Sequence, residues 1–206
     1  FRNTAAPSAT TPAFAPAEIN PFGIGGDVGS SSPEFADIDG DGDLDLFIGN
    51  EDGNTFFFRN TAALGATTPA FAPAEIDPFG IGGVGFDASP AFADIDGDGD
   101  LDLFIGNAGQ KLVLEDGNTL FFRNTAAPGS TTPAYATAET NPFGITDVLE
   151  LTVAGGRANP AFADTDNDGD LDLFIGSGFG NTLFFRNTAA PGATAPAFAA
   201  AEITFG

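Results

Sequence analysis

An unusually acidic run of nine residues reads Asp37-Ile38-Asp39-Gly40-Asp41-Gly42-Asp43-Leu44-Asp45. It recurs as residues 94–102 and, with two changed residues, as residues 164–172. Each copy follows the pattern D-x-D-x-D-G-x-x-D, with carboxylates at positions 1, 3, 5 and 9 and a glycine at position 6, where a calcium loop turns sharply. Because Ca²⁺ takes six to eight oxygen ligands, this spacing predicts three calcium sites.

The predicted metal ligands are the aspartates at the odd positions of each loop. Position 7 commonly contributes only its carbonyl oxygen, so we expect three of these side chains to point outward, those of Asp43, Asp100 and Asp170. Without a cation, so many neighbouring carboxylates would repel one another, which disfavours a plain solvated turn. Mg²⁺ is disfavoured because it demands tighter octahedral geometry and keeps its waters. The full set is Asp37, Asp39, Asp41, Asp43, Asp45, Asp94, Asp96, Asp98, Asp100, Asp102, Asp164, Asp166, Asp168, Asp170 and Asp172.

The composition argues against several classes of function. The chain has 206 residues and a formal net charge of −23, which disfavours nucleic acid and anionic membranes as partners. It contains no stretch of about twenty apolar residues, so we expect no membrane insertion. Histidine and cysteine are absent, and the carboxylates are concentrated in loops that a metal would saturate. We therefore expect no enzymatic activity.

The absence of cysteine also bears on stability and location. With no disulfides available, bound calcium is expected to take over the stabilising role. Low-affinity calcium loops favour an environment with millimolar calcium, so we expect an extracellular or cell-surface location. The sequence begins Phe1-Arg2 and contains no methionine, which indicates a processed or internal segment of a longer chain.

A longer repeat surrounds each acidic loop. The sequence reads P-x-F-A-D before the loop and L-F-I-G after it, followed by G-N-T-x-F-F-R-N-T-A and P-A-F-A-x-A-E. In the first repeat we predict strands at residues 35–38, 44–48, 55–61 and 70–76, since short apolar runs alternate with turn residues. The pattern predicts an all-β chain of tandem four-stranded antiparallel repeats at residues 33–80, 90–145 and 160–206. Residues 1–19 form an additional hairpin equivalent to the last two strands of a repeat.

The repeats differ mainly in their connections. The first two acidic loops begin 57 residues apart and the second and third 70 apart. The extra residues lie around Lys111 and Leu149, and loops that vary in this way often bind a partner. The phenylalanine runs, such as residues 56–58, 121–122 and 184–185, are better explained as core packing than as a sugar-binding surface, because Phe lacks the polar edge of Tyr and Trp.

Four arginines recur in the F-R-N-T segments, and each precedes a glutamate by about sixteen residues. If the last two strands of each repeat pair, each Arg is expected to face its Glu across the hairpin. The alternative is that both side chains only keep an exposed face soluble. The pairs are Arg2 with Glu18, Arg59 with Glu75, Arg123 with Glu139, and Arg186 with Glu202.

The segment F-A-D-I-D-G-D-G-D-L-D-L-F-I-G, followed by G-N-T-x-x-F-F-R-N, resembles the FG-GAP or VCBS-type repeat of bacterial surface and secreted proteins. It is also similar to the calcium-bearing blades of integrin α-subunit propellers. The resemblance implies blade-like four-stranded sheets with calcium held by the aspartates of the first inter-strand loop. Three repeats are fewer than the six or seven usual in this family and than the four to eight blades that close a propeller. We therefore expect no closed propeller in the monomer.

The third loop departs from the other two at its fourth position. It carries Asn167 where the others carry Gly40 and Gly97. Asparagine tolerates a left-handed backbone better than most residues, so we expect this change to be mild.

The number of hairpins bears on whether the protein associates with other copies of itself. The first two strands of each repeat form a hairpin that carries the acidic loop, and the chain has three of these. The last two strands form a second kind of hairpin, and the chain has four of these because residues 1–19 add one. One hairpin therefore has no partner, and its edge can serve as a template for another strand or sheet. We expect a non-enzymatic, calcium-stabilised extracellular structural or adhesive protein, with self-association end to end into a filament. A competing interpretation is that missing residues of a longer chain complete a propeller. The alternative function is a glycan- or protein-binding module that contacts its partner through the two insertions.

Overall fold

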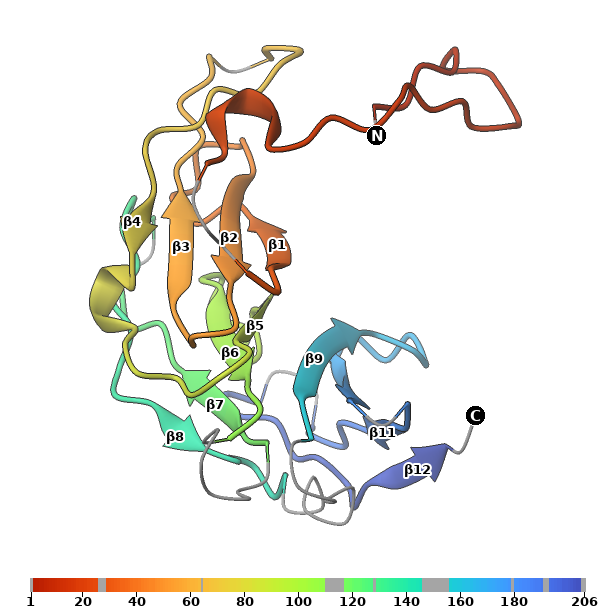
Figure 1. The fold of residues 1–206 in the computed structure, drawn as a ribbon. Helices are drawn as coiled ribbons and strands as arrows, with labels where there is room; N and C mark the ends of the chain where they lie inside the picture. Colours follow the sequence, from red (N-terminus) through yellow and green to blue (C-terminus); the bar gives the residue numbers. More distant parts are fainter. Residues whose placement is uncertain are drawn as a thin grey trace.

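The computed structural model describes residues 2–25, 29–63, 65–109, 117–127, 129–145, 156–178, 180–190 and 193–204. These residues form three antiparallel sheets of four strands each, in which the strands follow one another in sequence order. Each sheet is one blade, and the three blades stand side by side in an open arc (Figure 1). The predicted all-β architecture of blade-like repeats is confirmed. Among the described residues, no helix has the length and apolar character needed to cross a bilayer.

The strands have nearly the same bounds in each blade. Blade 1 contains β1 (Ser32–Ala36), β2 (Asp45–Gly49), β3 (Thr55–Phe58) and β4 (Glu75–Ile76). Blade 2 contains β5 (Ser89–Ala93), β6 (Asp102–Gly106), β7 (Thr119–Phe122) and β8 (Glu139–Thr140). Blade 3 contains β9 (Ala158–Ala163), β10 (Asp172–Ser177), β11 (Thr182–Phe185) and β12 (Glu202–Thr204). Two short 3-10 turns, η1 (Pro21–Gly23) and η2 (Pro78–Gly80), lead towards blades 1 and 2.

The second strand of each blade reads D-L-F-I-G because both of its faces are covered. In β2, Leu46 and Ile48 pack with Phe58 on one side of the sheet. Phe47 points to the other side, where its ring lies 4.7 Å from that of Phe57 between ring centroids. Successive strand residues point to opposite faces, so a continuous apolar run is what a strand between two packed layers requires. The phenylalanine runs thus lie mainly in the core, as expected.

Neighbouring blades are joined by a close contact between backbones, which we call the blade joint. The N–H of Ala88, just before β5, donates to the carbonyl oxygen of Asn50 at 2.9 Å, and Ala158 donates to Asn107 at 3.0 Å. A Cβ atom on Gly49 would lie only 2.1 Å from the carbonyl oxygen of Ala88. The glycine that ends the second strand therefore permits the contact.

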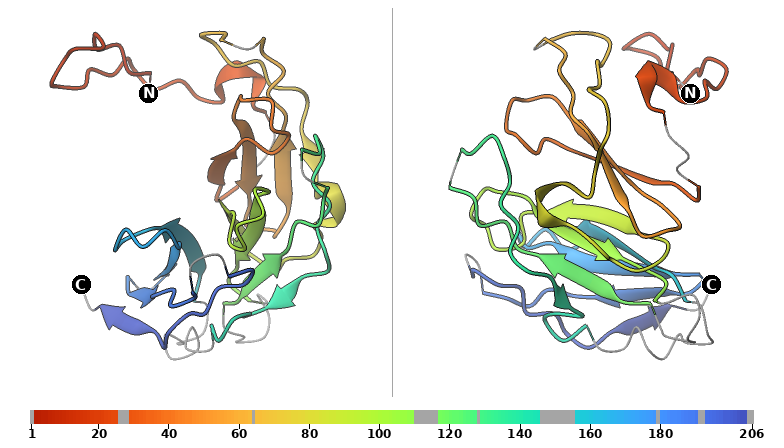
Figure 2. Two further views of the ribbon diagram at one scale, coloured as in Figure 1. Left: turned by 180° about the vertical axis from the view of Figure 1, so that it is seen from behind. Right: turned by 60° about the vertical axis from the view of Figure 1, so that its left-hand side comes forward.

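The blade joint also explains how the strands are arranged around the arc. The first strands β1 and β5 contact each other, as do β5 and β9. They lie on the inner side of the arc, and the later strands fan outward (Figure 2). This is the order of strands in a propeller blade, in which the first strand is innermost.

The outer strands are shorter than the sequence predicts, and the reason is a bulge. In blade 1, Phe57 pairs with Glu75 and Asn60 forms an isolated bridge with Phe71. Between these two pairs, the segment that follows Phe57 has two residues and the opposite segment, which leads to Glu75, has three. One extra residue on one side of a strand pair is a β-bulge. Instead of a continuous strand over residues 70–76, only β4 and the bridge form, and β3 ends at Phe58 rather than at residue 61. The predicted first strand at residues 35–38 is also displaced, since β1 covers Ser32–Ala36.

The N-terminal hairpin and the insertions lie at the margins of this architecture. Residues 2–19 contain one isolated bridge, between Asn3 and Phe14, and the segment projects from the arc (Figure 1). The insertion residues 110–116 and 146–155, including Lys111 and Leu149, lie outside the described residues.

The blade joint makes a direct prediction about stability. Gly106→Ala should lower the free energy of unfolding by about 1–3 kcal/mol, because its methyl group would lie 2.1 Å from the carbonyl oxygen of Ala158. The matched control is Gly176→Ala, at the equivalent place in blade 3, where the nearest atoms to the added Cβ lie 3.9 Å away. It should change stability by less than about 0.5 kcal/mol. Denaturant unfolding measures both, and equal effects would contradict this account of the joint.

Candidate metal centre

Each acidic loop connects the first strand of a blade to the second and is folded by its own carboxylates. In the first loop, Asp37 accepts hydrogen bonds from the backbone N–H of Asp41 at 3.1 Å and of Gly42 at 3.0 Å. Asp41 in turn accepts one from the N–H of Asp43 at 2.9 Å. The second loop repeats these contacts at Asp94 and Asp98.

The sharp turns rely on left-handed backbone. Gly40 and Gly42 have φ angles of 69° and 91°. Asn167 occupies the position of Gly40 in the third loop with a φ of 60°. The exchange of Gly for Asn is therefore accommodated without a change of turn, as expected.

The loops bring together the carboxylates at positions 1, 3 and 5. In each loop one oxygen from each of these residues lies within 4.8 Å of the others. The aspartates at positions 7 and 9 are not part of these close groups. The three groups are Asp37, Asp39 and Asp41; Asp94, Asp96 and Asp98; and Asp164, Asp166 and Asp168.

The carboxylate at position 9 is buried at the start of the second strand. Asp45 and Asp102 are each 1% exposed, and each accepts the backbone N–H of an asparagine, Asn60 or Asn124, at 2.7 Å. Burial raises the pKa of Asp45 to about 6 and that of Asp102 to about 7, because a desolvated carboxylate resists ionisation. Asp45 and Asp102 are thus held in an environment that penalises an uncompensated charge.

Several buried oxygens of these residues lack a hydrogen-bond donor among the described residues. They are Oδ2 of Asp45, Oδ2 of Asp102 and Oδ1 of Asp96. Buried polar atoms are normally satisfied, and an exception calls for an explanation such as an ion. The second loop carries two of these atoms beside its close group of carboxylates, a donor set that suits a hard cation.

The position 3 aspartate forms an ion pair with the arginine of F-R-N-T. The pairs are Arg59 with Asp39, Arg123 with Asp96, and Arg186 with Asp166. The guanidinium carbon of Arg59 also lies 5.4 Å from the ring centroid of Phe57, and the other two arginines repeat this contact with Phe121 and Phe184. The arginine thus neutralises part of the charge of each loop.

These contacts correct the prediction that each arginine faces a glutamate. Among the described ion pairs, none joins an Arg to its expected Glu. Glu75 stands opposite Phe57 in the sheet, because the bulge shifts the register between Phe57 and Asn60. Arg59 therefore reaches back to the acidic loop instead of across the hairpin.

The third loop differs from the first two. Thr165 stands where the others carry Ile38 and Ile95, and its hydroxyl donates to Oδ2 of Asp172. Burial raises the pKa of Asp172, but hydrogen bonds from Thr165 and Asn187 outweigh it, so the pKa is lowered overall. The carboxylates at positions 1, 3 and 5 are all exposed in this loop. The three loops are therefore chemically unequal.

The asparagine of F-R-N-T was not predicted to have a role, although it recurs in every repeat. Oδ1 of Asn124 accepts the N–H groups of Ala126 and Ala134 at 3.1 Å and 3.0 Å. Nδ2 donates to the carbonyl oxygen of Leu101 at 3.3 Å. Asn60 and Asn187 make the same contacts. This side chain links the acidic loop to the connection between the third and fourth strands. The asparagine directly follows the arginine in every repeat, and this constant position is the sequence signal from which its role could have been predicted.

A family model described as FG-GAP-like repeat matches residues 37–105. The matched segment runs from the start of the first acidic loop into β6 and therefore includes two of the three loops. The resemblance inferred from the sequence is confirmed. A search of curated proteins found no match to the chain.

The asparagine network leads to a testable expectation. Asn124→Ala should lower the free energy of unfolding by about 1–3 kcal/mol, because two backbone N–H groups would lose their acceptor. Asn159→Ala is the control, since this exposed side chain makes one weak contact, at 3.4 Å to Gly176. Its effect should stay below about 0.5 kcal/mol. Similar losses in chemical denaturation would contradict a special role for Asn124.

Proposed function

We propose that this chain is a non-enzymatic structural or adhesive module that acts outside the cell and is stabilised by calcium. The observation that carries the proposal is the second loop, in which three carboxylates converge and buried oxygens of Asp96 and Asp102 lack donors. Asp94, Asp96, Asp98 and Asp102 would supply the oxygen ligands. The corresponding residues of the other loops would hold the second and third ions.

The burial and charge of the loop favour a cation over protonation. Neutralising Asp102 by a proton would satisfy one oxygen, but it would leave the exposed carboxylate of Asp98 close to those of Asp94 and Asp96. One divalent ion compensates several of these charges at once, and the arginine pair compensates another. Oxygen-only ligands in a flexible loop favour Ca²⁺ over Mg²⁺.

The role assigned to calcium is structural. The loop links the innermost strand of each blade to the buried second strand, so an ion that fixes the loop also fixes the pairing of these strands. Because the carboxylates are assembled only in the folded chain, binding free energy adds to folding stability. Millimolar calcium is available outside cells, which supports an extracellular setting.

Calcium should therefore raise the melting temperature, and a chelator should lower it. Free calcium at a hundredfold excess over the dissociation constant stabilises by about 2.7 kcal/mol for one site. Asp98→Asn should weaken binding in the second loop with little effect on the metal-free protein, because Asp98 is exposed. The measurements are thermal melts and calorimetric titrations, with magnesium as control. An unchanged midpoint with and without chelator would remove the proposal.

The third loop should bind calcium more weakly than the first two. Its carboxylates are exposed, and Oδ2 of Asp172 already accepts hydrogen bonds from Thr165. Thr165→Ile should raise the affinity of this site towards that of the others, whereas Thr165→Ser retains the hydroxyl and should leave it weak. Titration calorimetry of the three proteins tests the difference, and three identical sites in the parent chain would contradict it.

A further inference from the structure

The two blade joints within the chain use the same pairs of aromatic rings. At the first joint, Phe92 of β5 packs on Phe47 of β2 with centroids 4.8 Å apart. Phe79 of the η2 turn packs on Phe57 of β3 at 5.2 Å. In each pair, the blade that comes first in the sequence supplies a ring from its second or third strand. The following blade and its entry turn supply the other.

The second joint repeats this arrangement. Phe162 of β9 packs on Phe104 of β6 at 4.7 Å, and Phe143 packs on Phe121 of β7 at 5.0 Å. Leu101 and Leu171, which precede the second strands of blades 2 and 3, pack into the same two clusters. The joint is therefore a repeating unit with two distinct halves.

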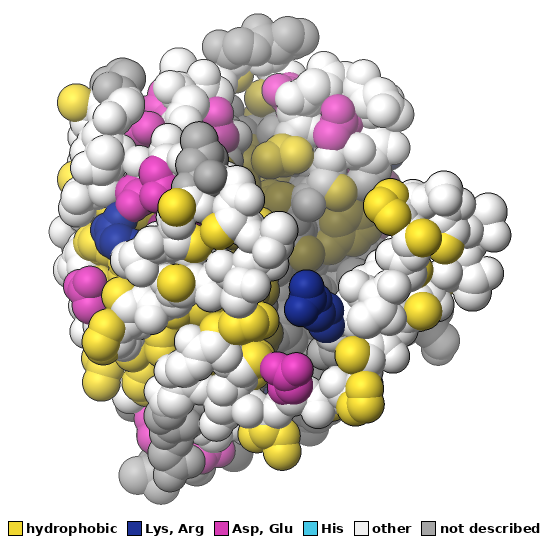
Figure 3. Space-filling view, turned by 90° about the horizontal axis from the view of Figure 1, so that it is seen from above, with side chains coloured by type: hydrophobic (Ala, Val, Ile, Leu, Met, Phe, Trp, Pro, Cys, Tyr) yellow, Lys and Arg dark blue, Asp and Glu magenta, His cyan; other side chains and the backbone are white. Residues whose placement is uncertain are grey.

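The N-terminal end of the arc presents one of these halves without a partner blade. Phe22, Phe35 and Leu44 correspond to Phe79, Phe92 and Leu101, but they are 48%, 53% and 55% exposed. All three line a cavity of about 540 Å³ on this end. Seen from above, the surface shows hydrophobic side chains gathered in a recess (Figure 3).

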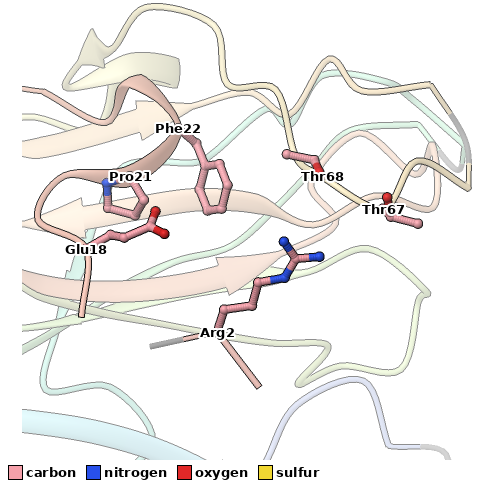
Figure 4. A pocket seen from close by; sticks show the side chains of 6 residues that line it. All are labelled: Arg2, Glu18, Pro21, Phe22, Thr67 and Thr68. Atoms are coloured by element: carbon pink, nitrogen blue, oxygen red, sulfur yellow. The ribbon is translucent and has the colours of Figure 1, made fainter. Parts of the chain in front are cut away.

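The hairpin does not close this end. Phe22 also borders a pocket of about 420 Å³ that Arg2 and Glu18 line from the hairpin side (Figure 4). The hairpin itself projects from the arc (Figure 1). The apolar end face therefore stays accessible next to it.

The C-terminal end presents the other half. Phe174 and Phe184 correspond to Phe47 and Phe57 and stack with centroids 4.8 Å apart. Both are partly exposed, whereas Phe47 and Phe57 are fully buried. Gly176 corresponds to Gly49 and Gly106, and the place taken by a neighbouring carbonyl oxygen at those two glycines is open beside it.

We propose that the two end faces bind each other between copies of this chain, head to tail. Phe35 and Phe22 of one copy would pack on Phe174 and Phe184 of the next. The backbone before β1 of the first copy would lie against Gly176 of the next. The occupant is a second copy because the required surface is already built twice within the chain. Exposed apolar patches of this kind commonly mark interaction sites.

Such a contact is heterologous, so it generates either a closed ring or an open filament. Two copies would bring together six blades, within the range of about four to eight at which propellers close. Rings and filaments share the same joint, and the proposal concerns that joint. The end faces include Leu44 and Thr165, which belong to acidic loops, so the test holds calcium constant. Its readout is assembly and not metal affinity, so this proposal and the calcium proposal can fail separately.

One difference limits the strength of this contact. Thr165 on the C-terminal face replaces the isoleucines that are buried at the two internal joints, Ile38 and Ile95. A polar side chain at this place reduces the apolar area that association would bury. Assembly should accordingly be reversible and dependent on protein concentration.

The test uses two variants that block opposite faces. Phe35→Asp places a charge in the N-terminal half of the joint. Gly176→Val fits the isolated chain, where the nearest atoms lie 3.9 Å from the new Cβ, but it should block a neighbouring carbonyl. Thr131→Asp is the control, because Thr131 is exposed in the loop between β7 and β8 of the middle blade, whose two faces already pack against neighbouring blades. Thermal melts verify that each variant is folded.

Sedimentation velocity and light scattering across a concentration series give the readout, with calcium held constant. The parent chain and Thr131→Asp should assemble, and each blocked variant should stay monomeric. An equal mixture of Phe35→Asp and Gly176→Val should form dimers and nothing larger, since one open face of each kind remains. A parent chain that is monomeric at every concentration, or a Gly176→Val protein that assembles like the parent, would overturn the proposal.

Discussion

Each blade buries one carboxylate at the start of its second strand, and much of the local structure serves to make this possible. Asp45, Asp102 and Asp172 are all 1% exposed. Removing a charge from water is costly unless it is paired or hydrogen-bonded. An asparagine N–H satisfies one oxygen of each carboxylate. The other oxygen lacks a donor among the described residues in Asp45 and Asp102, and accepts hydrogen bonds from Thr165 in Asp172. The loop, the strand and the outer connection are thus tied to one charged group.

The arginine and the asparagine of F-R-N-T stabilise different parts of each blade. The guanidinium group pairs with the position 3 carboxylate of the loop, and the asparagine amide bridges the backbone around the outer hairpin. Because both residues follow the third strand directly, a single short motif links three parts of each blade. Contacts between blades are then made by nearest neighbours, as in other repeat proteins.

The acidic loops and the blades could be predicted from the sequence because their signals are local. A D-x-D-x-D-G run specifies a loop, and D-L-F-I-G specifies a strand buried on both faces. The arginine partner could not be predicted in the same way. Its separation from Asp39 is 20 residues in the first repeat but 27 in the second, whereas the misleading spacing to glutamate is constant. The bulge was also missed. The carboxylate of Asp45 accepts the N–H of Asn60 in place of a strand carbonyl, and Pro73, which stands at the bulge in blade 1, has no proline counterpart in the other two blades.

The blade joint has a mechanical consequence. A carbonyl oxygen rests where a methyl group would otherwise be, at both Gly49 and Gly106, so neighbouring sheets have little room to pivot. Hydrogen bonds beside each contact resist sliding. An array of such units should therefore be stiff and evenly curved, with little rotation between neighbouring blades. Because the glycine at each blade joint has no Cβ atom, the two backbones can meet this closely, and this close contact fixes the curvature of the whole array.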